Sequence, residues 1–263
     1  MTKTQPAAAQ SHLTLRTISA LMLREMSSTY GRSVAGYFWA LAEPVGGVIL
    51  LTVVFSLALR APALGDSFAL YYASGFLPFS AFTELSRRVS ASINFSKSLL
   101  HYPRVTYVDA ILARVILNGL TQVMIGAIIL AVLIPFSRSH IFLDVPVVFL
   151  SYLMAIALAV GIGTLNCYLF WRFPAWERVW NVITRPLFIG SAIFYNFESV
   201  PESVKWLLWY NPLVHVVGQA RKGIYELYEP TYISLVFVFG LSIGLLVVGL
   251  FLLWLNNKEI VNG

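Results

Sequence analysis

Charged residues are scarce in this chain, and that scarcity is its first informative property. Of 263 residues, 11% are charged and 58% are hydrophobic. A soluble domain carries about 25% charged residues. A larger core does not account for the deficit, because the surface of a soluble protein still has to be covered with polar groups. The composition therefore predicts a protein embedded in a lipid bilayer.

Cysteine is nearly absent as well. The single Cys167 excludes an intrachain disulfide framework and a cysteine-based metal site. The chain also lacks a GxxxxGK[ST] phosphate loop and an HExxH metal-binding pair. We therefore expect no catalytic, cofactor or metal site here, so any ATP and Mg²⁺ that drive its activity would lie on another polypeptide.

Long apolar runs fill most of the chain. A helix needs about 20 apolar residues to cross a bilayer. Six spans are expected at Tyr37–Leu59, Phe68–Phe82 with an amphipathic continuation, Ala110–Phe136, Val145–Trp171, Val179–Phe197 and Tyr232–Leu255. None has the alternation over about ten residues that a β-barrel strand requires. The expected fold is all-α, with six transmembrane helices in a domain at residues 37–263.

Lysine and arginine placement predicts the orientation. With the N-terminus in the cytoplasm, 13 of the 18 basic residues fall on the inner side. The outer side receives Arg60, Arg138, Lys205, Arg221 and Lys222. Because inner loops carry an excess of positive charge, we expect both termini to be cytoplasmic.

One further apolar stretch, Val204–Gln219, suggests a seventh span. It is too short to cross a bilayer, and Asn211-Pro212 interrupts it. Two half-helices that enter from the outer face and turn back fit this pattern better, provided that protein or water shields the turn. We therefore expect a re-entrant outer hairpin near residues 198–229, between the fifth and sixth spans.

The N-terminal region, residues 1–36, contains an amphipathic helix at Leu13–Tyr30. Its apolar positions recur at spacings of three and four: Leu15, Ile18, Met22, Met26 and Tyr30. Arg16, Arg24 and Glu25 are expected to lie off that face. The pattern is typical of an interfacial helix on the inner leaflet, which either only anchors the chain or also contacts a cytosolic partner.

A short cytoplasmic connection, Ser96–Thr106, joins the second and third spans. Pro103 disfavours a helical conformation at Tyr102, so the preceding helix should end there. The segment is either a simple connector or a docking element for an energising subunit.

Some charged residues lie inside apolar segments, where charge is costly. These are Glu43, Glu84, Asp109, Arg114 and Arg185, which we place near span ends on the inner side. They either reach the interface, pair with one another, or serve function. We find no carboxylate relay at mid-membrane and no internal repeat, which disfavours an ion-coupled transporter.

The expected outer hairpin is rich in aromatic side chains, including Trp206 and Trp209. Aromatic rings suit sugar rings by stacking, and they equally suit the membrane interface. Location alone favours interface anchoring. His215 is interpreted as a packing or hydrogen-bonding residue rather than a metal ligand.

Several segments resemble a known family. Arg24-Glu25, Tyr30-Gly31-Arg32 and the run from Gly36 to Pro44 resemble the opening of ABC type-2 permeases, especially the capsular polysaccharide export permeases of Gram-negative bacteria. Tyr102-Pro103-Arg104-Val105 resembles their cytoplasmic connection, in which Tyr-Arg-Pro-Val is frequent. The segment from Tyr210 to Val217 resembles their outer hairpin, although Gly218 stands where an acidic residue is common. The resemblance covers essentially the whole chain.

The resemblance implies a transport subunit and its partners. Such permeases form a homodimer, bind two copies of a cytoplasmic ATP-binding subunit, and pass lipid-linked polysaccharide to periplasmic adaptor and outer-membrane export proteins. They do not bind nucleic acid. The implied location is the bacterial inner membrane, with several spans.

The same resemblance implies roles for individual residues. ATPase coupling would involve Arg24, Glu25, Ser98, Leu99, Leu100, His101, Tyr102, Pro103 and Arg104. The substrate channel would involve Arg32, Tyr37, Trp39, Tyr71, Tyr72, Phe76, Phe79, Arg87 and Arg88. The outer gate would involve Trp206, Trp209, Tyr210, Asn211, Pro212 and His215. Clustered inner arginines suit an acidic polymer or a phosphate, and the positive-inside tendency explains them equally well.

Two other interpretations stay open. One is an ABC type-2 permease for another cargo, such as O-antigen, teichoic acid or a drug. The other is a membrane enzyme of lipid-linked sugar assembly, which would need paired carboxylates or a nucleotide-sugar loop facing the cytoplasm.

Overall fold

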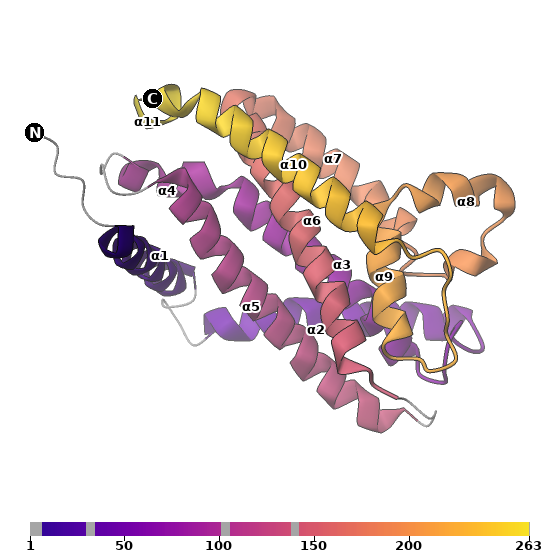
Figure 1. The fold of residues 1–263 in the computed structure, drawn as a ribbon. Coiled ribbons are helices and arrows are strands. Elements are labelled where there is room, and N and C mark those ends of the chain that lie inside the picture. Colours follow the sequence, from indigo (N-terminus) through magenta and orange to yellow (C-terminus); the bar gives the residue numbers. More distant parts are fainter. Residues whose placement is uncertain (1–6, 30–34, 101–105, 138–141, 263) are drawn as a thin grey trace, which may run out of the picture.

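A computed structural model of the chain describes residues 7–29, 35–100, 106–137 and 142–262. These residues form helices joined by turns, without a strand (Figure 1). The α-helices are α1 (Ala7–Thr29), α2 (Ala35–Ala58), α3 (Phe68–Ser90), α4 (Ser92–Leu100), α5 (Tyr107–Leu133), α6 (Val145–Arg172), α7 (Pro174–Gly190), α8 (Glu202–Trp209), α9 (Pro212–Lys222), α10 (Leu235–Leu255) and α11 (Asn257–Asn262). Two 3₁₀ turns are η1 (Ile134–Phe136) and η2 (Phe197–Ser199).

Four of the described helices are long and apolar enough to cross a bilayer. They include Phe38–Ala58, Tyr107–Phe136, Val145–Arg172 and Leu235–Leu255. Helix α3 has 23 residues but carries three charges near its C-terminal end, and α7 has only 17 residues. The all-helical membrane fold is therefore confirmed, whereas the number of six spans and their orientation stay predictions.

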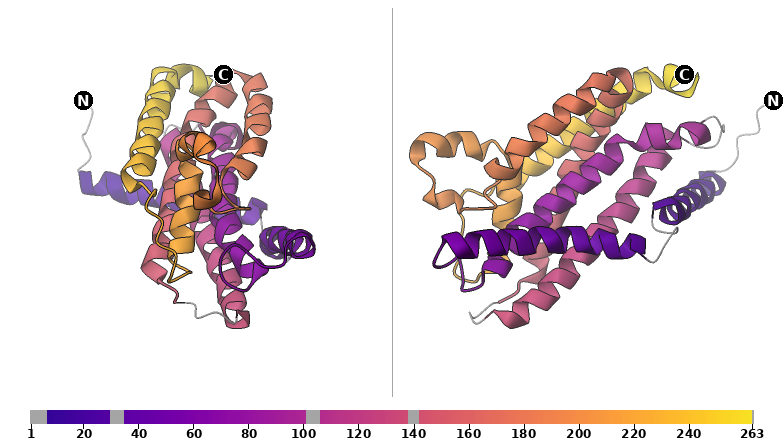
Figure 2. Two further views of the ribbon diagram at one scale, coloured as in Figure 1. Left: turned by 90° about the vertical axis from the view of Figure 1, so that its right-hand side faces the viewer. Right: turned by 180° about the vertical axis from the view of Figure 1, so that it is seen from behind.

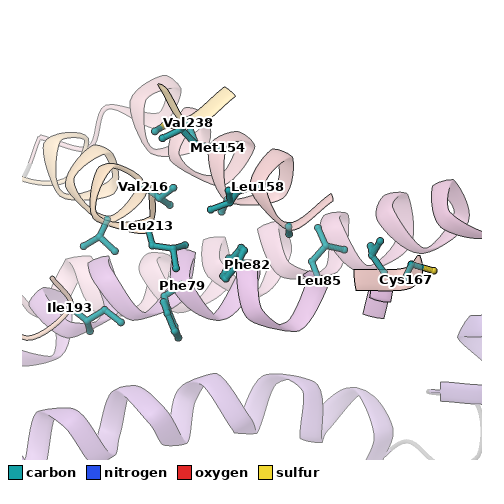
Figure 3. Close-up of a cluster of buried hydrophobic side chains, with 14 of the residues drawn as sticks. Phe79, Phe82, Leu85, Met154, Leu158, Cys167, Ile193, Leu213, Val216 and Val238 are labelled. Atoms are coloured by element: carbon teal, nitrogen blue, oxygen red, sulfur yellow. The ribbon is translucent and has the colours of Figure 1, made fainter. Parts of the chain in front are cut away.

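The core forms where α3, α6, α9 and α10 meet. Figure 3 shows Phe82 of α3 close to Leu158 of α6 and Leu213 of α9, with Val238 of α10 farther along α6 and Phe79 on the opposite side of α3. All five side chains are at most 5% exposed. Glu84, Arg87 and Arg88 of α3 alternate along the helix with Leu85 and Val89 of this core, so α3 contributes both core and polar surface.

Small residues allow α6 and α10 to approach closely. A Cβ atom added at Gly249 would lie 2.7 Å from the backbone nitrogen of Leu165. Ser242 of α10 is 2% exposed, and its hydroxyl donates to the carbonyl of Val238. Glycine and serine at such contacts are typical of helix packing in membranes.

The helices divide between two ends of the molecule. Helices α1, α4 and α11 lie at one end and α8 lies at the other, as Figure 1 and the right-hand view of Figure 2 show. The N-terminal end of α2 and the C-terminal end of α3 also point toward the first end (Figure 1). This common end carries the segments for which we predicted a cytoplasmic location.

The fifth apolar run differs from its prediction. We expected a span at Val179–Phe197, but α7 begins at Pro174 and ends at Gly190. Ala192 adopts φ +57°, a left-handed conformation that ends a helix. The run therefore continues as a buried turn rather than as helix, and Arg185 lies beyond the middle of α7 instead of near its inner end.

Candidate functional site

A polar pocket of about 300 Å³ lies between α2, α3 and α5. Its lining includes Trp39 and Glu43 of α2, Glu84 and Arg87 of α3, and Gln122 of α5. The ring of Trp39 is 67% exposed. The pocket thus combines an open aromatic ring, carboxylates, a guanidinium and an amide in one hollow.

Glu84 organises the charges of this pocket. Its Oε2 accepts from Arg87 Nε at 3.1 Å, and its Oε1 accepts from Arg88 Nε at 2.7 Å. These residues follow Glu84 by three and four positions, so they share one helical face. The side chain of Arg87 is 69% exposed, so its ion pair with Glu84 contributes little to the stability of the fold. Glu84 therefore holds Arg87 and Arg88 at the pocket wall and offsets part of their positive charge.

The predicted channel residues separate into two groups. Trp39, Arg87 and Arg88 line the polar pocket. Tyr71, Tyr72 and Phe79 are buried in the core, and Phe76 packs against that core. Arg32 and the side chain of Tyr37 lie outside the described residues. In the single chain, therefore, only the first group faces an open hollow, and a channel lined by the others stays a prediction.

A buried ion pair joins α1 to α5. Arg114 Nε lies 3.4 Å from Glu25 Oε2, and both side chains are at most 5% exposed. Asn118 donates to Glu25 Oε1 at 3.3 Å, and the Arg114 guanidinium lies 4.3 Å from the centroid of the Phe95 ring in α4. The cluster connects three helices at one end of the bundle.

Our placement of Glu25 off the apolar face of α1 was wrong. Glu25 is 3% exposed, while Arg24 is exposed. Position 25 follows Ile18 by seven residues, which is nearly two full turns, so the two share a face. Arg114 neutralises the carboxylate on that face, which is why a charged residue is tolerated there.

The predicted coupling connection is described only in part. Ser98, Leu99 and Leu100 belong to α4, but their side chains, together with all of His101, Tyr102, Pro103 and Arg104, lie outside the described residues. Thr106 caps α5: its hydroxyl accepts from the Asp109 N–H, and the Asp109 carboxylate accepts from the Thr106 N–H at 3.0 Å. Asp109 is thereby a capping residue.

Helices α8 and α9 divide the stretch that resembled a seventh span. The break occurs at Tyr210-Asn211, where the Asn211 side chain accepts from the Leu213 N–H at 3.0 Å and donates to the Gly190 carbonyl at 2.9 Å. Pro212 follows at the first helical position, which needs no N–H donor. The predicted interruption is confirmed, whereas its position in a membrane stays a prediction.

The two helices differ in environment. In α8, Trp206 is 64% exposed, and Tyr210 at its end is 63% exposed. In α9, every residue from Leu213 to Arg221 is buried. The predicted gate residues therefore comprise an exposed arm and a helix held within the protein.

His215 and Trp209 connect α9 to the segment before α10. The Ser234 N–H donates to His215 Nδ1 at 3.2 Å, so the proton resides on Nε2, which lies 2.8 Å from the Trp209 carbonyl. Trp209 Nε1 donates to the Tyr232 carbonyl at 3.1 Å. Both ring nitrogens of His215 are thus occupied as in a neutral imidazole. The packing role predicted for His215 agrees with these contacts.

Two tyrosines extend this cluster outward. The Tyr228 hydroxyl lies 3.4 Å from that of Tyr232 and donates to Glu198 Oε2 at 3.1 Å. Both phenols thus have a hydrogen-bond partner within the protein.

Arg221, which sequence analysis placed among the outer cations, is 1% exposed. Its guanidinium donates to the carbonyls of Ile193 and Tyr195, each at 2.8 Å. It also lies 4.3 Å from the centroid of the Tyr71 ring. Among the described residues it forms no ion pair. Arg221 thus ties the C-terminal end of α9 to the turn after α7 and to α3.

Helical periodicity could have revealed this residue. Arg221 follows Val214 by seven positions and Val217 by four, so it continues the apolar face of α9. A basic residue on such a face needs buried acceptors, and the carbonyls of the turn after α7 supply them.

Neither a metal centre nor the nucleophile elbow of a hydrolase is apparent in the part of the chain that the structure covers. No group of three His, Cys, Asp or Glu side chains is arranged to hold a metal there. The letters GxSxG do occur at residues 240–244, but they lie inside the continuous helix α10. A nucleophile elbow requires a strand-to-helix turn, so this match carries no chemistry.

Comparison with known proteins identifies the family. The sequence pattern of the family described as ABC-2 type transporter matches residues 16–225. The chain belongs to the ABC-2 type transporter family. The matched range begins within α1 and extends past α9. Membership makes this chain a transport subunit rather than an enzyme, and it implies a separate subunit that binds and hydrolyses ATP.

Individual ABC-2 relatives match along most of this permease. The polysialic acid transport protein KpsM of Escherichia coli is 30% identical over 237 residues, which cover 89% of this chain and 91% of KpsM. The capsule polysaccharide export inner-membrane protein CtrC of Neisseria meningitidis is 30% identical over 250 residues, covering 90% and 91%. The O-antigen export system permease protein RfbA of Klebsiella pneumoniae is 22% identical over 239 residues, covering 87% and 88%.

Proposed function

We propose that this chain is the membrane-spanning permease subunit of an ATP-driven exporter that moves capsular, lipid-linked polysaccharide across the bacterial inner membrane. The observation that carries the proposal is the likeness to KpsM and CtrC along about nine-tenths of each chain. The polar pocket supports it, because an exposed tryptophan beside charged and amide side chains suits a sugar ring.

We further propose the assembly. Two copies of this permease form the pore, and two copies of a cytoplasmic ATP-binding subunit, which hold ATP and Mg²⁺, drive it. Each permease crosses the membrane six times with both termini in the cytoplasm. Periplasmic adaptor and outer-membrane export proteins receive the polymer. The positive-inside distribution of lysine and arginine supports this orientation.

Coupling is assigned to one end of the molecule. Helix α1 and the connection at 96–106 would contact the ATP-binding subunit. The Glu25–Arg114 pair supports this assignment, because it links α1 to α5 directly and to α4 through Phe95. Movement imposed on α1 would therefore pass to the two helices that flank the connection. In this scheme Arg24 contacts the partner, and Glu25 positions α1.

The outer gate is assigned to α8 and α9. Asn211 and Arg221 hold the two ends of α9 against the turn at residues 190–196. A gate has to change position, so we expect the hydrogen bonds of Asn211 and Arg221 to this turn to break when α8 and α9 move.

Deletion of the gene tests the function. We expect acidic polysaccharide to accumulate inside cells and to disappear from their surface, as measured by carbohydrate staining of intact and permeabilised cells. Complementation with the wild-type gene is the control. Unchanged surface polymer would contradict the proposed cargo, and complete loss of polymer would instead favour an enzyme of lipid-linked sugar assembly.

A second cargo, O-antigen, is favoured by one observation. RfbA, an O-antigen export permease by name, also matches 87% of this chain, at 22% identity. In the same deletion strain, loss of O-antigen from the lipopolysaccharide with an intact capsule would establish this alternative.

A further inference from the structure

The charges that line the polar pocket are divided between two helices. On the α3 wall, Glu84 pairs with Arg87 and Arg88, so one carboxylate faces two guanidiniums and one positive charge is in excess. On the α2 wall, Glu43 forms no ion pair within the described parts of the chain. The pocket therefore has a positive wall on α3 and a negative wall on α2.

The two walls do not neutralise each other. Among the described residues, no salt bridge joins Glu43 to an arginine, and a hollow of about 300 Å³ lies between the helices. This volume is at the lower end of small-molecule pockets. A ligand with a single charge would be attracted by one wall and repelled by the other. A small head that carries both charges complements both walls.

An exposed aromatic ring lies on the negative wall. Trp39 precedes Glu43 by four positions, so the two residues share a face of α2. Trp39 is 67% exposed, so its ring is accessible to a cation. An ammonium group is attracted to the face of an indole ring, and its N–H groups form charge-assisted hydrogen bonds to a carboxylate. The α2 wall thus suits an ammonium group.

The positive wall suits a phosphate. Nε and Nη2 of Arg87 donate to Glu84, and the side chain of Arg87 is still 69% exposed, so its remaining N–H groups are accessible. Guanidinium N–H groups form short, strong hydrogen bonds to phosphate oxygens. Gln122 of α5 adds an amide to the same lining, and an amide N–H can donate to a phosphate oxygen as well.

The pocket lies near one end of the helices that form it. The part of α2 that is apolar enough to cross a bilayer begins at Phe38, so Trp39 and Glu43 belong to its first turns. Arg87 and Arg88 belong to the last turn of α3. The ends of membrane-spanning segments lie at the depth of the lipid head groups. A phospholipid head is therefore present at the level of the pocket without being delivered to it.

We propose that the polar pocket binds the head of a zwitterionic phospholipid, phosphatidylethanolamine, with its ammonium at Trp39 and Glu43 and its phosphate at Arg87. The acyl chains stay in the surrounding bilayer. The inference goes beyond the proposed function, because this lipid occupies the pocket of the resting permease whichever cargo is moved. A sugar of the cargo that enters the same pocket has to displace the lipid head.

The test measures lipid retention by the purified full-length chain. The protein is placed in phosphatidylcholine nanodiscs that contain equal amounts of phosphatidylethanolamine and phosphatidylglycerol with identical acyl chains. Native mass spectrometry then counts the lipids that stay bound. The choline head of the host lipid has no N–H group to donate to Glu43. We expect phosphatidylethanolamine to be retained about tenfold more than phosphatidylglycerol, the ratio that one charge-assisted hydrogen bond provides.

Charge reversal on the α2 wall gives the sharpest comparison. In Glu43→Lys both walls are positive, so we expect the preference to reverse and phosphatidylglycerol to be retained more than phosphatidylethanolamine. Glu226→Lys is the matched control and should keep the original preference, because it makes the same charge change at an exposed residue outside the pocket.

A second pair of variants tests the aromatic ring. Trp39→Leu should lower the retention of phosphatidylethanolamine about threefold, because the cation loses the indole face. Trp254→Leu, at a residue that is 63% exposed on α10, should leave that retention unchanged. Thermal unfolding of each variant verifies that it folds.

Three outcomes would overturn the inference. Equal retention of the two lipids by the wild-type chain indicates a non-selective annular site, and preferential retention of phosphatidylglycerol indicates a site for phosphate alone. An unchanged preference in Glu43→Lys indicates that phosphatidylethanolamine binds elsewhere on the chain. The deletion experiment is independent: export that needs the gene without selective lipid retention defeats only this inference, and selective retention without an export defect defeats only the proposed function.

Discussion

Arg221 shows how a single residue can depend on the surrounding fold. A count of basic residues treats it as one of five outer cations, yet it is 1% exposed and hydrogen-bonded to backbone carbonyls of the turn after α7. A buried guanidinium without a carboxylate is stabilised by such carbonyls and by the face of an aromatic ring. Here the ring belongs to Tyr71, 4.3 Å away. The sequence places Arg221 on the apolar face of α9, but it does not indicate which carbonyl groups accept its hydrogen bonds.

Replacing Arg221 with methionine should weaken the attachment of α9. The carbonyls of Ile193 and Tyr195 would lose their donors inside the protein, at a cost of about 2 kcal/mol. We expect the purified chain to unfold several degrees lower, as measured by thermal unfolding in detergent. Lys222→Met is the matched control, because it removes one positive charge from the adjacent exposed position. Equal shifts in both variants would show that charge rather than hydrogen bonding is responsible.

Helix α1 shows what is decided at the scale of an element. The sequence predicted an amphipathic helix at Leu13–Tyr30, and α1 spans Ala7–Thr29. The periodicity predicted the helix, and of its expected apolar face Ile18 is buried and Met22 and Met26 are half-buried, while the side chain of Leu15 and all of Tyr30 lie outside the described residues. It could not assign Glu25 to that face, because a carboxylate is buried only when a cation from another helix neutralises it. Arg114, 89 positions later in the sequence, provides that cation.

Removing the charge of Glu25 should release α1 from α5. Glu25→Gln leaves Arg114 buried without its ion pair, which costs roughly 3 kcal/mol. Ile18→Cys reports the release, since Ile18 is 9% exposed and the native Cys167 is 1% exposed. We expect maleimide to label Cys at position 18 slowly in the Ile18→Cys chain and at least about tenfold faster once Glu25→Gln is added.

Two further variants make this result interpretable. Arg24→Gln, at an exposed neighbouring position, should leave the labelling of Ile18→Cys unchanged. Ser19→Cys, also exposed, should be labelled rapidly in every background. Rapid labelling of Ile18→Cys with Glu25 intact would show that α1 does not stay packed on α5.

Some helix boundaries are set by adjacent residues, and others are set by residues that are distant in the sequence. The predicted starts at Phe68 and Val145 are confirmed, because side chains just before them act as caps: Ser67 accepts from Leu70 and Asp144 from Val147. The end of α7 at Gly190 was not predicted. The run stays apolar beyond it, and the turn at Ala192 is stabilised from outside by Asn211 and Arg221. A cap is formed by residues next to the helix and can be predicted from the sequence. The turn after α7 depends on contacts with α9, which a local pattern does not indicate.

At the scale of the whole molecule, the long helix α7 is poorly covered by its neighbours. None of its residues is buried, and Arg185 is exposed beyond its midpoint. An arginine facing hydrocarbon costs about 3 kcal/mol. That cost is avoided if the open side of α7 faces a second copy or a water-filled path between two copies, as in the proposed homodimer.

Crosslinking along α7 tests this arrangement. Val182 is 64% exposed on α7, and Val248 is 49% exposed on α10. In membranes, Val182→Cys should form a crosslinked dimer with a short bismaleimide, because the same position on two symmetric copies lies near their shared axis. Val248→Cys is the comparison and should stay monomeric. The reverse result would move the dimer contact to α10.

By itself, the sequence determined the class of environment, the helical nature of the chain, most helix positions and the breaking point at Tyr210-Asn211. These depend on composition, apolar run length and caps, which act over a few residues. The family resemblance also assigned Trp39, Arg87 and Arg88 to a substrate channel, and these three line one pocket. Glu84 and Gln122 join them in a pocket only because α2, α3 and α5 converge.

Only the tertiary structure decided which polar residues are buried and which aromatic residues are open. Tyr71, Tyr72 and Phe79, which we predicted to line a channel, are buried in the core of the single chain, whereas Trp39 is exposed. Glu25 and Arg221 looked like surface charges but are buried with distant partners. A charged or polar side chain is buried without a large cost only where its polar groups find partners inside the protein. The choice therefore follows from which helices meet, and that is fixed by packing across the whole bundle.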